Sequence, residues 1–192
     1  MQISAGHLNF EWAGDWAKLP SEDSIARGWA HHGMAFSKNG QIVTFHPAES
    51  LVVVMTTEGE LVSSFEVPVI EAHGITLDTR GLTQSIWIAD SGRKRNPDHD
   101  YDYMPDPPIG KVMRFSMSGF AEMEMSAPDI PEYLTGTFSP TSVVAFDDHM
   151  GGNGDIWVAD GYGESLVHRY NADGEYLMSI DGTHGSGRFA CP

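Results

Sequence analysis

A four-part pattern of short apolar segments returns three times along the 192-residue chain, and this repetition constrains the fold more than any other feature. Each copy holds four runs of about five residues, rich in β-branched and aromatic side chains, which is typical of short strands. The last two runs of each copy flank a turn that ends in Gly59, Gly119 or Gly174. Because such turns need a residue with positive φ, glycine at one offset in every copy indicates hairpins in a common register.

The spacing of the copies predicts an all-β fold of the β-propeller class. The first copy opens at His32, the second opens 41 positions later at His73, and the third opens at Pro140. Helical periodicity is missing from every stretch of useful length. Four strands per unit and a period of about 40 residues are characteristic of propeller blades.

We expect one domain over residues 1–192 that contains three blades. Propellers close with about four to eight blades, so three blades predict an incomplete ring. The predicted parts are an N-terminal segment with a closing strand at 1–31, a blade at 32–72, a blade at 73–139 with an inserted loop at 93–109, and a blade with the start of the next linker at 140–192.

Charge and hydropathy limit the partners. The chain has 27 Asp and Glu residues against 11 Lys and Arg residues, a formal net charge of -16. This balance argues against nucleic acids and anionic membranes, and it fits metals, cationic ligands or basic peptides better, although solubility alone also accounts for it.

Neither an export signal nor a run of 18 apolar residues occurs, so we expect no membrane segment and the compartment stays open. The single Cys191 allows no internal disulfide.

Three short motifs carry a resemblance to a known family. The segments His73-Gly74-Ile75, Asp160-Gly161-Tyr162 and residues 187–192 resemble those of NHL-repeat β-propellers, in particular peptidyl-α-hydroxyglycine α-amidating lyase and its bacterial relatives. The likeness covers about residues 12–192, and its strand and turn motifs are shared by NHL proteins in general. The resemblance implies a six-bladed propeller with a central zinc ion held by histidines and a structural calcium ion. It also implies a tyrosine and an arginine that cleave an α-hydroxyglycine peptide into an amidated peptide and glyoxylate.

The resemblance assigns a role to each matching position. His73 matches a zinc-ligand histidine, and neutral imidazoles that converge on an axis suit Zn²⁺ with one position open for substrate. Ile75 matches a residue whose backbone carbonyl faces the calcium ion. Tyr162 matches the catalytic tyrosine, which would take the hydroxyl proton of a carbinolamide. His32 occupies the position of His73 one blade earlier, which makes it a candidate second metal ligand.

Two departures from the family pattern leave two functions open. Pro47 stands where the resemblance expects an arginine, and Leu166 replaces a second arginine that usually follows the tyrosine turn. The first function is a metal-dependent lyase at the propeller axis. The alternative is a non-catalytic propeller that binds a peptide or protein there, in which case His73 is a hydrogen-bonded histidine and Tyr162 a packing residue.

Overall fold

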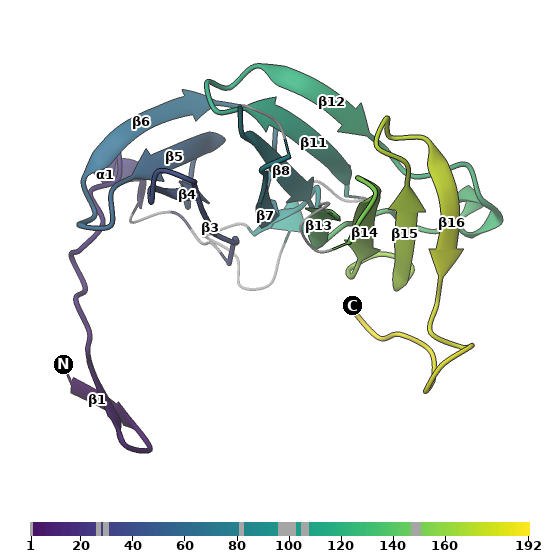
Figure 1. Cartoon of the computed structure of the whole chain (residues 1–192), viewed down its shortest axis with the longest axis horizontal. Helices are drawn as coiled ribbons and strands as arrows, with labels where there is room; N and C mark the ends of the chain where they lie inside the picture. The colour runs from purple at the N-terminus through teal and green to yellow at the C-terminus, as the bar shows by residue number, and fades with distance from the viewer. Residues whose placement is uncertain are drawn as a thin grey trace.

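Each of the three repeats folds into one four-stranded antiparallel sheet, which confirms the predicted all-β propeller architecture (Figure 1). The computed structural model describes residues 2–25, 28, 31–80, 83–95, 103–104, 108–146 and 151–192. The first sheet contains β3 (Ala35–Phe36), β4 (Ile42–Phe45), β5 (Leu51–Met55) and β6 (Leu61–Glu66). The second contains β7 (Ala72–Asp78), β8 (Ser85–Asp90), β11 (Lys111–Ser116) and β12 (Ala121–Met125). The third contains β13 (Ser142–Ala145), β14 (Ile156–Asp160), β15 (Leu166–Tyr170) and β16 (Tyr176–Ile180).

The three sheets fan around a common centre as an open arc. Figure 1 shows β3, β7 and β13 on the concave side and β6, β12 and β16 on the convex side. The middle inner strand β7 contacts both β3 and β13. The three turn glycines have φ values of 86°, 88° and 84°, so the common hairpin register predicted from Gly59, Gly119 and Gly174 is present.

Neighbouring inner strands approach each other so closely that the sequence must supply small residues there. A Cβ atom on Gly74 would lie 2.6 Å from the Thr141 carbonyl oxygen, which no side chain tolerates. The Thr76 hydroxyl donates a hydrogen bond to the Val143 carbonyl oxygen at 2.8 Å. The backbones of the second and third blades are therefore in close contact at the axis, and a side-chain hydroxyl bonds one to the other.

The core lies between neighbouring sheets, and strand β8 contributes residues to the core on both of its faces. All six residues of β8 are buried, because one face of the strand contacts the first blade and the other face contacts the third. Ile86 and Ile88 pack with residues of the first blade, whereas Trp87 and Ala89 pack with residues of the third. The middle of this strand, Ile86–Ala89, is thus apolar at every position because both of its faces are covered.

A buried aspartate at the end of β8 fixes the segment that leads into the second blade. Asp90 is fully buried, and its carboxylate accepts hydrogen bonds from the backbone N–H groups of Ile70, Glu71 and Gly92 at 2.8, 2.9 and 2.9 Å. Ile70 and Glu71 directly precede β7. The aspartate therefore connects the second strand of its blade to the entry of that blade's inner strand.

The residues at the equivalent positions of the other blades also form hydrogen bonds with backbone groups of the connecting segments. Asp160, at the end of β14, accepts a hydrogen bond from the Ser139 N–H group ahead of β13 and another from the Glu164 N–H group. In the first blade His46 follows β4, and its Nε2 atom donates to the Pro20 carbonyl oxygen at 3.0 Å. Its Nδ1 atom accepts from the Ala48 and Glu49 N–H groups. A histidine thus replaces the aspartate by offering a donor on one side and an acceptor on the other.

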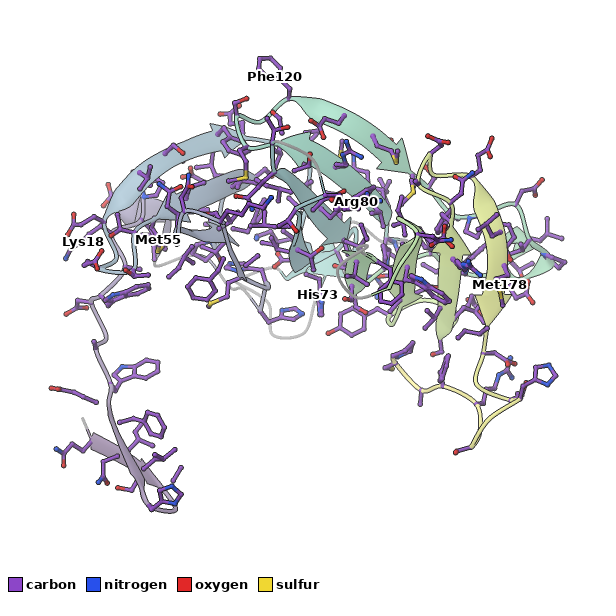
Figure 2. All side chains as sticks on the ribbon, in the orientation of Figure 1. Lys18, Met55, His73, Arg80, Phe120 and Met178 are labelled. Carbon is purple, nitrogen blue, oxygen red and sulfur yellow. The ribbon has the colours of Figure 1, made fainter. Side chains whose placement is uncertain are left out.

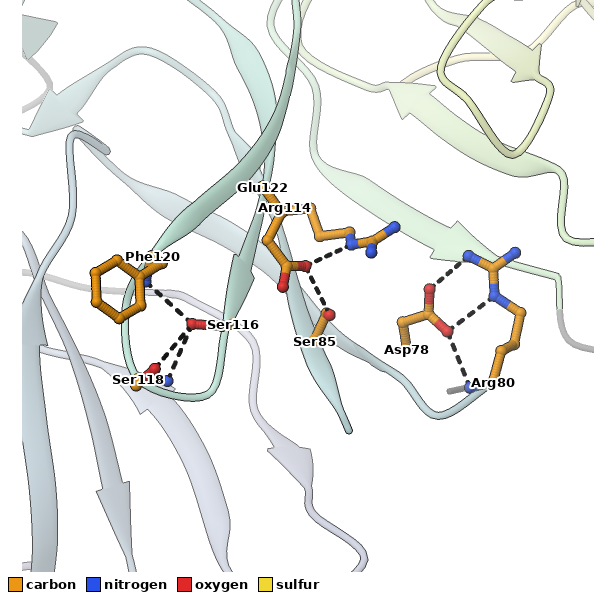
Figure 3. A network of polar contacts seen from close by, with 8 residues as sticks. All are labelled: Asp78, Arg80, Ser85, Arg114, Ser116, Ser118, Phe120 and Glu122. Atoms are coloured by element: carbon orange, nitrogen blue, oxygen red, sulfur yellow. Dashed lines mark hydrogen bonds and ion pairs between the residues drawn. The ribbon is translucent and has the colours of Figure 1, made fainter. Parts of the chain in front are cut away.

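An arginine joins the second and third blades. Arg80 forms an ion pair with Asp78 of its own blade (Figure 3). It also donates from Nη1 to the Gly154 carbonyl oxygen of the third blade at 2.8 Å. The same figure shows Glu122 accepting from both Arg114 and Ser85 within the second blade. These contacts fix the edges of the sheets, whereas the apolar interfaces hold their faces.

The remaining elements are short. They are the hairpin β1 (Gln2–Ala5) and β2 (Leu8–Glu11), the helix α1 (Glu22–Ile25), the strand pair β9 (Lys94–Arg95) and β10 (Tyr103–Met104) within the predicted insert, and the 3₁₀ helix η1 (Pro131–Leu134).

The N-terminal hairpin extends away from the three blades (Figure 1). Strand pairing among the described residues of 1–31 is confined to β1 and β2, so the closing strand stays a prediction. The following segment is attached to the first blade, because Trp16 Nε1 donates to the Thr57 carbonyl oxygen and the Lys18 N–H group to that of Gly59. None of the helices in the described part of the chain is long and apolar enough to cross a membrane.

Candidate functional site

The fold brings together His73 and Tyr162, two residues that the sequence analysis selected separately. His73 lies near the start of the inner strand β7, and Figure 2 shows it on the concave side of the arc. Tyr162 follows β14 and is anchored by its own N–H group, which donates to the Ser139 carbonyl oxygen. The two side chains meet with 3.0 Å between His73 Nε2 and the tyrosine hydroxyl oxygen.

A backbone carbonyl fixes which nitrogen of His73 carries the proton. The Nδ1 atom lies 2.8 Å from the Thr141 carbonyl oxygen, which can only accept, so Nδ1–H is the donor. In the neutral ring the lone pair is then on Nε2, where it accepts a hydrogen bond from the Tyr162 hydroxyl. The pair is therefore a base and a proton donor in direct contact, which is the arrangement that proton transfer needs.

His31 is the third member of this cluster, and the sequence analysis did not select it. Its Nε2 atom lies 3.4 Å from the Tyr162 hydroxyl oxygen, and its ring meets that of His73 edge to face at a centroid distance of 4.7 Å. The Gly33 N–H group donates to the His73 carbonyl oxygen, so the segment ahead of β3 runs beside the start of β7. Burial, together with the nearby His73 and Lys94, lowers the pKa of His31.

His32, the candidate from the sequence, contacts the first blade. Its Nδ1 atom lies 3.3 Å from the Thr44 hydroxyl, and its ring packs edge to face on Phe45 at 6.1 Å. Within the described structure its Nε2 atom is buried and without a hydrogen-bond partner. Burial is the main cause that lowers the pKa of His32 to about 4, with Lys94 and the neighbouring histidines adding to it.

Ile75 lies on the same strand as His73 but has its side chain in the core. It is 5% exposed and belongs to the apolar cluster between the first and second blades. Only its backbone carbonyl is left for binding a cation, as the resemblance implies. The described residues contain no cluster of three or more His, Cys, Asp or Glu side chains that could hold a metal ion.

A cleft of about 410 Å³ opens beside the cluster and contains a cation that the sequence analysis did not select. Arg93 lines it together with His31 and Tyr162. Arg93 follows β8 as Tyr162 follows β14, so the repeat itself places both residues at the same end of the propeller. The other lining residues are Ser91, Gly161, Gly163, Ser165 and Cys191.

A larger hollow of about 970 Å³ lies between β16 and residues 182–189. It contains His184 and Arg188, but both side chains belong to an exposed glycine-rich segment. We place the candidate site in the smaller cleft, because it is lined by Arg93 and by Tyr162, whose hydroxyl contacts the histidine of fixed tautomer, His73.

Comparisons with known proteins give similarity at the level of fold. Neither a family model nor a curated protein matches the chain. A catalytically inactive virginiamycin B lyase from Staphylococcus aureus, solved with quinupristin, is 16% identical with a TM-score of 0.49, over 79% of this chain and 41% of that one. A protein of unknown function from Bacteroides caccae is 14% identical with a TM-score of 0.46, over 81% and 46%. A streptogramin B lyase is 14% identical with a TM-score of 0.40, over 79% and 54%.

The chain spans about half the length of these solved structures. At such identities the activity of a neighbour says nothing about the activity of this chain.

Proposed function

We propose that the cleft beside His73 and Tyr162 is a lyase site that cleaves the C–N bond of a peptidyl-α-hydroxyglycine or a related carbinolamide. The observation that supports this best is the 3.0 Å contact between His73 Nε2 and the Tyr162 hydroxyl, with the histidine tautomer fixed by Thr141. Breakdown of a carbinolamide needs a group that removes the hydroxyl proton and a group that protonates the departing nitrogen. A contacting base and acid meet both needs.

The proton movements follow from the resting hydrogen bonds. Tyr162 removes the hydroxyl proton of the substrate while its own proton passes to His73 Nε2. The C–O bond becomes a carbonyl, and the electron pair of the C–N bond leaves with the nitrogen. The proton on His73 then neutralises the amide nitrogen, so the products are a peptide amide and glyoxylate, and the enzyme regains its starting protonation.

Arg93 supplies a positive charge for the substrate carboxylate. Its side chain lines the same cleft as Tyr162, and a guanidinium group can hold a carboxylate through two parallel hydrogen bonds. Pro47, which stands where the resemblance expects an arginine, packs its backbone against Gly28 instead. The cation of this site would therefore come from the second blade.

Zinc fits the donor atoms at His73. The Nδ1 atom is held by a carbonyl, which directs the lone pair of Nε2 toward the cluster, as in many metal-ligating histidines. When bound there, zinc would polarise the oxygen of the substrate and would occupy the Nε2 lone pair, so it would take the place of the proton transfer from Tyr162 to His73. Calcium would be bound by the Ile75 carbonyl together with oxygen atoms from elsewhere, and no step is assigned to it.

The alternative is a propeller that binds a peptide or small molecule at the axis without converting it. The replacement of two expected arginines by Pro47 and Leu166 favours this alternative. Leu166 is 5% exposed and pairs with Asp160 in the third blade, so it has a structural role. Both functions place the ligand in the same cleft, and the charge of -16 keeps nucleic acids outside our proposal.

Glyoxylate release from an N-acylated α-hydroxyglycine peptide tests the proposal. Tyr162→Phe should lower the rate by about 10²–10⁴-fold, the usual contribution of a positioned acid or base. Tyr176→Phe is the matched control, because Tyr176 is also partly exposed but its hydroxyl contacts Ser179 in the third blade. If the wild-type chain binds the peptide but releases glyoxylate no faster than buffer does, the lyase proposal is wrong and the binding function stands.

A further inference from the structure

We infer that Ser179 is the nucleophile of a second site, which takes the acyl group of a small carboxylic ester. The observation behind the inference is a line of hydrogen bonds that runs from this serine into the third blade. Ser179 Oγ lies 2.8 Å from His168 Nδ1, and His168 Nε2 lies 2.7 Å from the Tyr133 hydroxyl oxygen. The Tyr133 hydroxyl donates to Asp160 Oδ2 at 2.7 Å. A serine, a histidine, a tyrosine and an aspartate are thus connected in one line.

The carboxylate sets the direction of every bond in this line. Because ionised Asp160 can only accept, the Tyr133 proton points to it, and the tyrosine oxygen accepts from His168 Nε2–H. The neutral imidazole then has its lone pair on Nδ1, where the Ser179 hydroxyl donates. Burial lowers the pKa of His168 to about 4, so at pH 7 the ring is neutral and the lone pair is present. A serine that donates to a histidine base is the arrangement of an activated nucleophile.

The histidine departs from the pattern of the other two blades. His168 is the cross-strand partner of Ser179 in the pairing of β15 with β16. The residue at the equivalent place is Val53 in the first blade and Met113 in the second, one residue before the register shift in each sheet. All three side chains are buried or nearly so. An apolar side chain is therefore sufficient for the packing of a blade at this position, and the line of hydrogen bonds is what the histidine adds.

Ser179 lines a hollow that an ester can enter. The hollow measures about 970 Å³, and the serine on its wall is half-buried. The wall also contains the apolar side chains of Leu166, Met178, Ile180 and Phe189, which favour an apolar acyl group. No described residue lines both this hollow and the cleft beside the axis. The inference therefore concerns a separate site and does not rest on the proposed lyase function.

The proton of the serine can move along the line without leaving a charged histidine. As Ser179 Oγ attacks the ester carbonyl carbon, its proton passes to His168 Nδ1, the Nε2 proton passes to the Tyr133 oxygen, and the Tyr133 proton passes to Asp160. Burial raises the pKa of Asp160, which helps this carboxyl group to hold the proton. The ester C–O bond then breaks, and the proton returns along the same line to the departing alcohol. Water releases the acid from the acyl-serine by the same transfers.

A fluorophosphonate probe tests the inference on the full chain. Such a probe forms an O–P bond with an activated serine and releases fluoride. We expect labelling at Ser179, located by peptide mass spectrometry, and loss of that label in Ser179→Ala. His168→Gln should slow the labelling by at least about tenfold. Because the glutamine amide offers one acceptor and one donor, it can keep contacts with Ser179 and Tyr133 but lacks the basic nitrogen.

A serine of the first blade provides the matched control. Ser64 stands at the place of Ser179 but opposite Val53, so it lacks a histidine partner in the strand pairing. Ser64 should stay unlabelled, and Ser64→Ala should be labelled at Ser179 as fast as the wild type. The inference is overturned if Ser179 of the wild type is not labelled, if Ser64 is labelled as fast, or if folded His168→Gln reacts like the wild type.

A second measurement decides the case if His168→Gln does not fold. With p-nitrophenyl acetate, the wild type should release a burst of about one p-nitrophenolate per chain as the acyl-serine forms. Ser179→Ala changes a half-buried residue on the outermost strand and should abolish the burst without loss of the fold. A burst of equal size in folded Ser179→Ala, or no burst in the wild type, would show that Ser179 is not a nucleophile.

Discussion

Replacement of Asp90 by alanine should destabilise the fold far more than the loss of one surface charge. The Asp90 side chain is fully buried and is not among the residues that line the cleft. Its two oxygens accept three backbone hydrogen bonds, from Ile70, Glu71 and Gly92. In Asp90→Ala these three N–H groups lose their acceptor in a region where little water can replace it.

The size of the effect follows from the number of stranded donors. An unsatisfied buried N–H group costs about 1–3 kcal/mol, so three groups give a gross loss of about 3–9 kcal/mol. Removal of the charge offsets part of this loss, because burial raises the pKa of Asp90 and the folded state already bears the cost of desolvating the carboxylate. We expect a net decrease of about 3 kcal/mol or more in the free energy of unfolding. Asp90→Asn keeps one acceptor oxygen and should lose about half as much.

Urea unfolding followed by tryptophan fluorescence measures this difference. Asp173→Ala is the matched control, because Asp173 lies exposed in a hairpin turn, and it should stay within about 0.5 kcal/mol of the wild type. Hydrogen exchange should accelerate at Ile70 and Glu71 in Asp90→Asn, which also serves if the alanine variant does not fold. A loss below about 1 kcal/mol in Asp90→Ala, or unchanged exchange at both amides, would refute the reasoning.

Three further perturbations test other parts of the structure. Burial lowers the pKa of His168 to about 4, so the unfolded chain takes up a proton first and stability falls as the pH drops from about 6.5 toward 4. Between pH 7 and pH 5, His168→Gln should remove about 2 kcal/mol of the decrease in the free energy of unfolding measured with urea, and an unchanged decrease would contradict this. Gly74→Ala should unfold at a lower urea concentration than Gly33→Ala. The added Cβ atom would lie 2.6 Å from a backbone oxygen in Gly74→Ala, but 3.0 Å from a backbone nitrogen in Gly33→Ala. Equal urea midpoints would argue against the close approach of the strands at the axis. Light scattering should show self-association that Leu177→Asp reduces, because β16 exposes apolar residues on both faces; a wild-type monomer at high concentration would exclude it.

The sequence predicted the blades because their signals are local. Strand patterning and glycine turns depend on neighbouring residues, so four strands appear within each repeat. The innermost strands differ from the pattern, because β3 covers only Ala35–Phe36 of the copy that opens at His32, and β7 begins at Ala72, one residue before the predicted blade. The contacts of Asp90 were not predictable in this way. Its partners Ile70 and Glu71 precede it by about 20 positions, and nothing in the pattern indicates where the carboxylate points.

The histidines show the same limit at the site. His73 lies within the inner strand β7, at a shift of the strand register between Ala72 and Gly74, and its place near the axis followed from the repeat. His31 and His32 precede β3 in an irregular segment, where no period indicates which ring faces the axis. A difference of one residue there decides between contact with Tyr162 and contact with Phe45. The role of Arg93 was not predicted for another reason. It is the first residue of an insert that has no counterpart in the other two repeats.

The stability of the third blade and the geometry of the site depend on the same few bonds. Asp160 binds the Ser139 N–H group, while the Ser139 carbonyl oxygen accepts from the Tyr162 N–H group. Two residues later Thr141 orients His73 through its carbonyl oxygen. The bonds that attach the entry of β13 to β14 therefore also set the distance between His73 and Tyr162. Because the two residues belong to different blades, the site exists only while those blades stay docked, and any change that separates the blades should abolish binding before it unfolds either sheet.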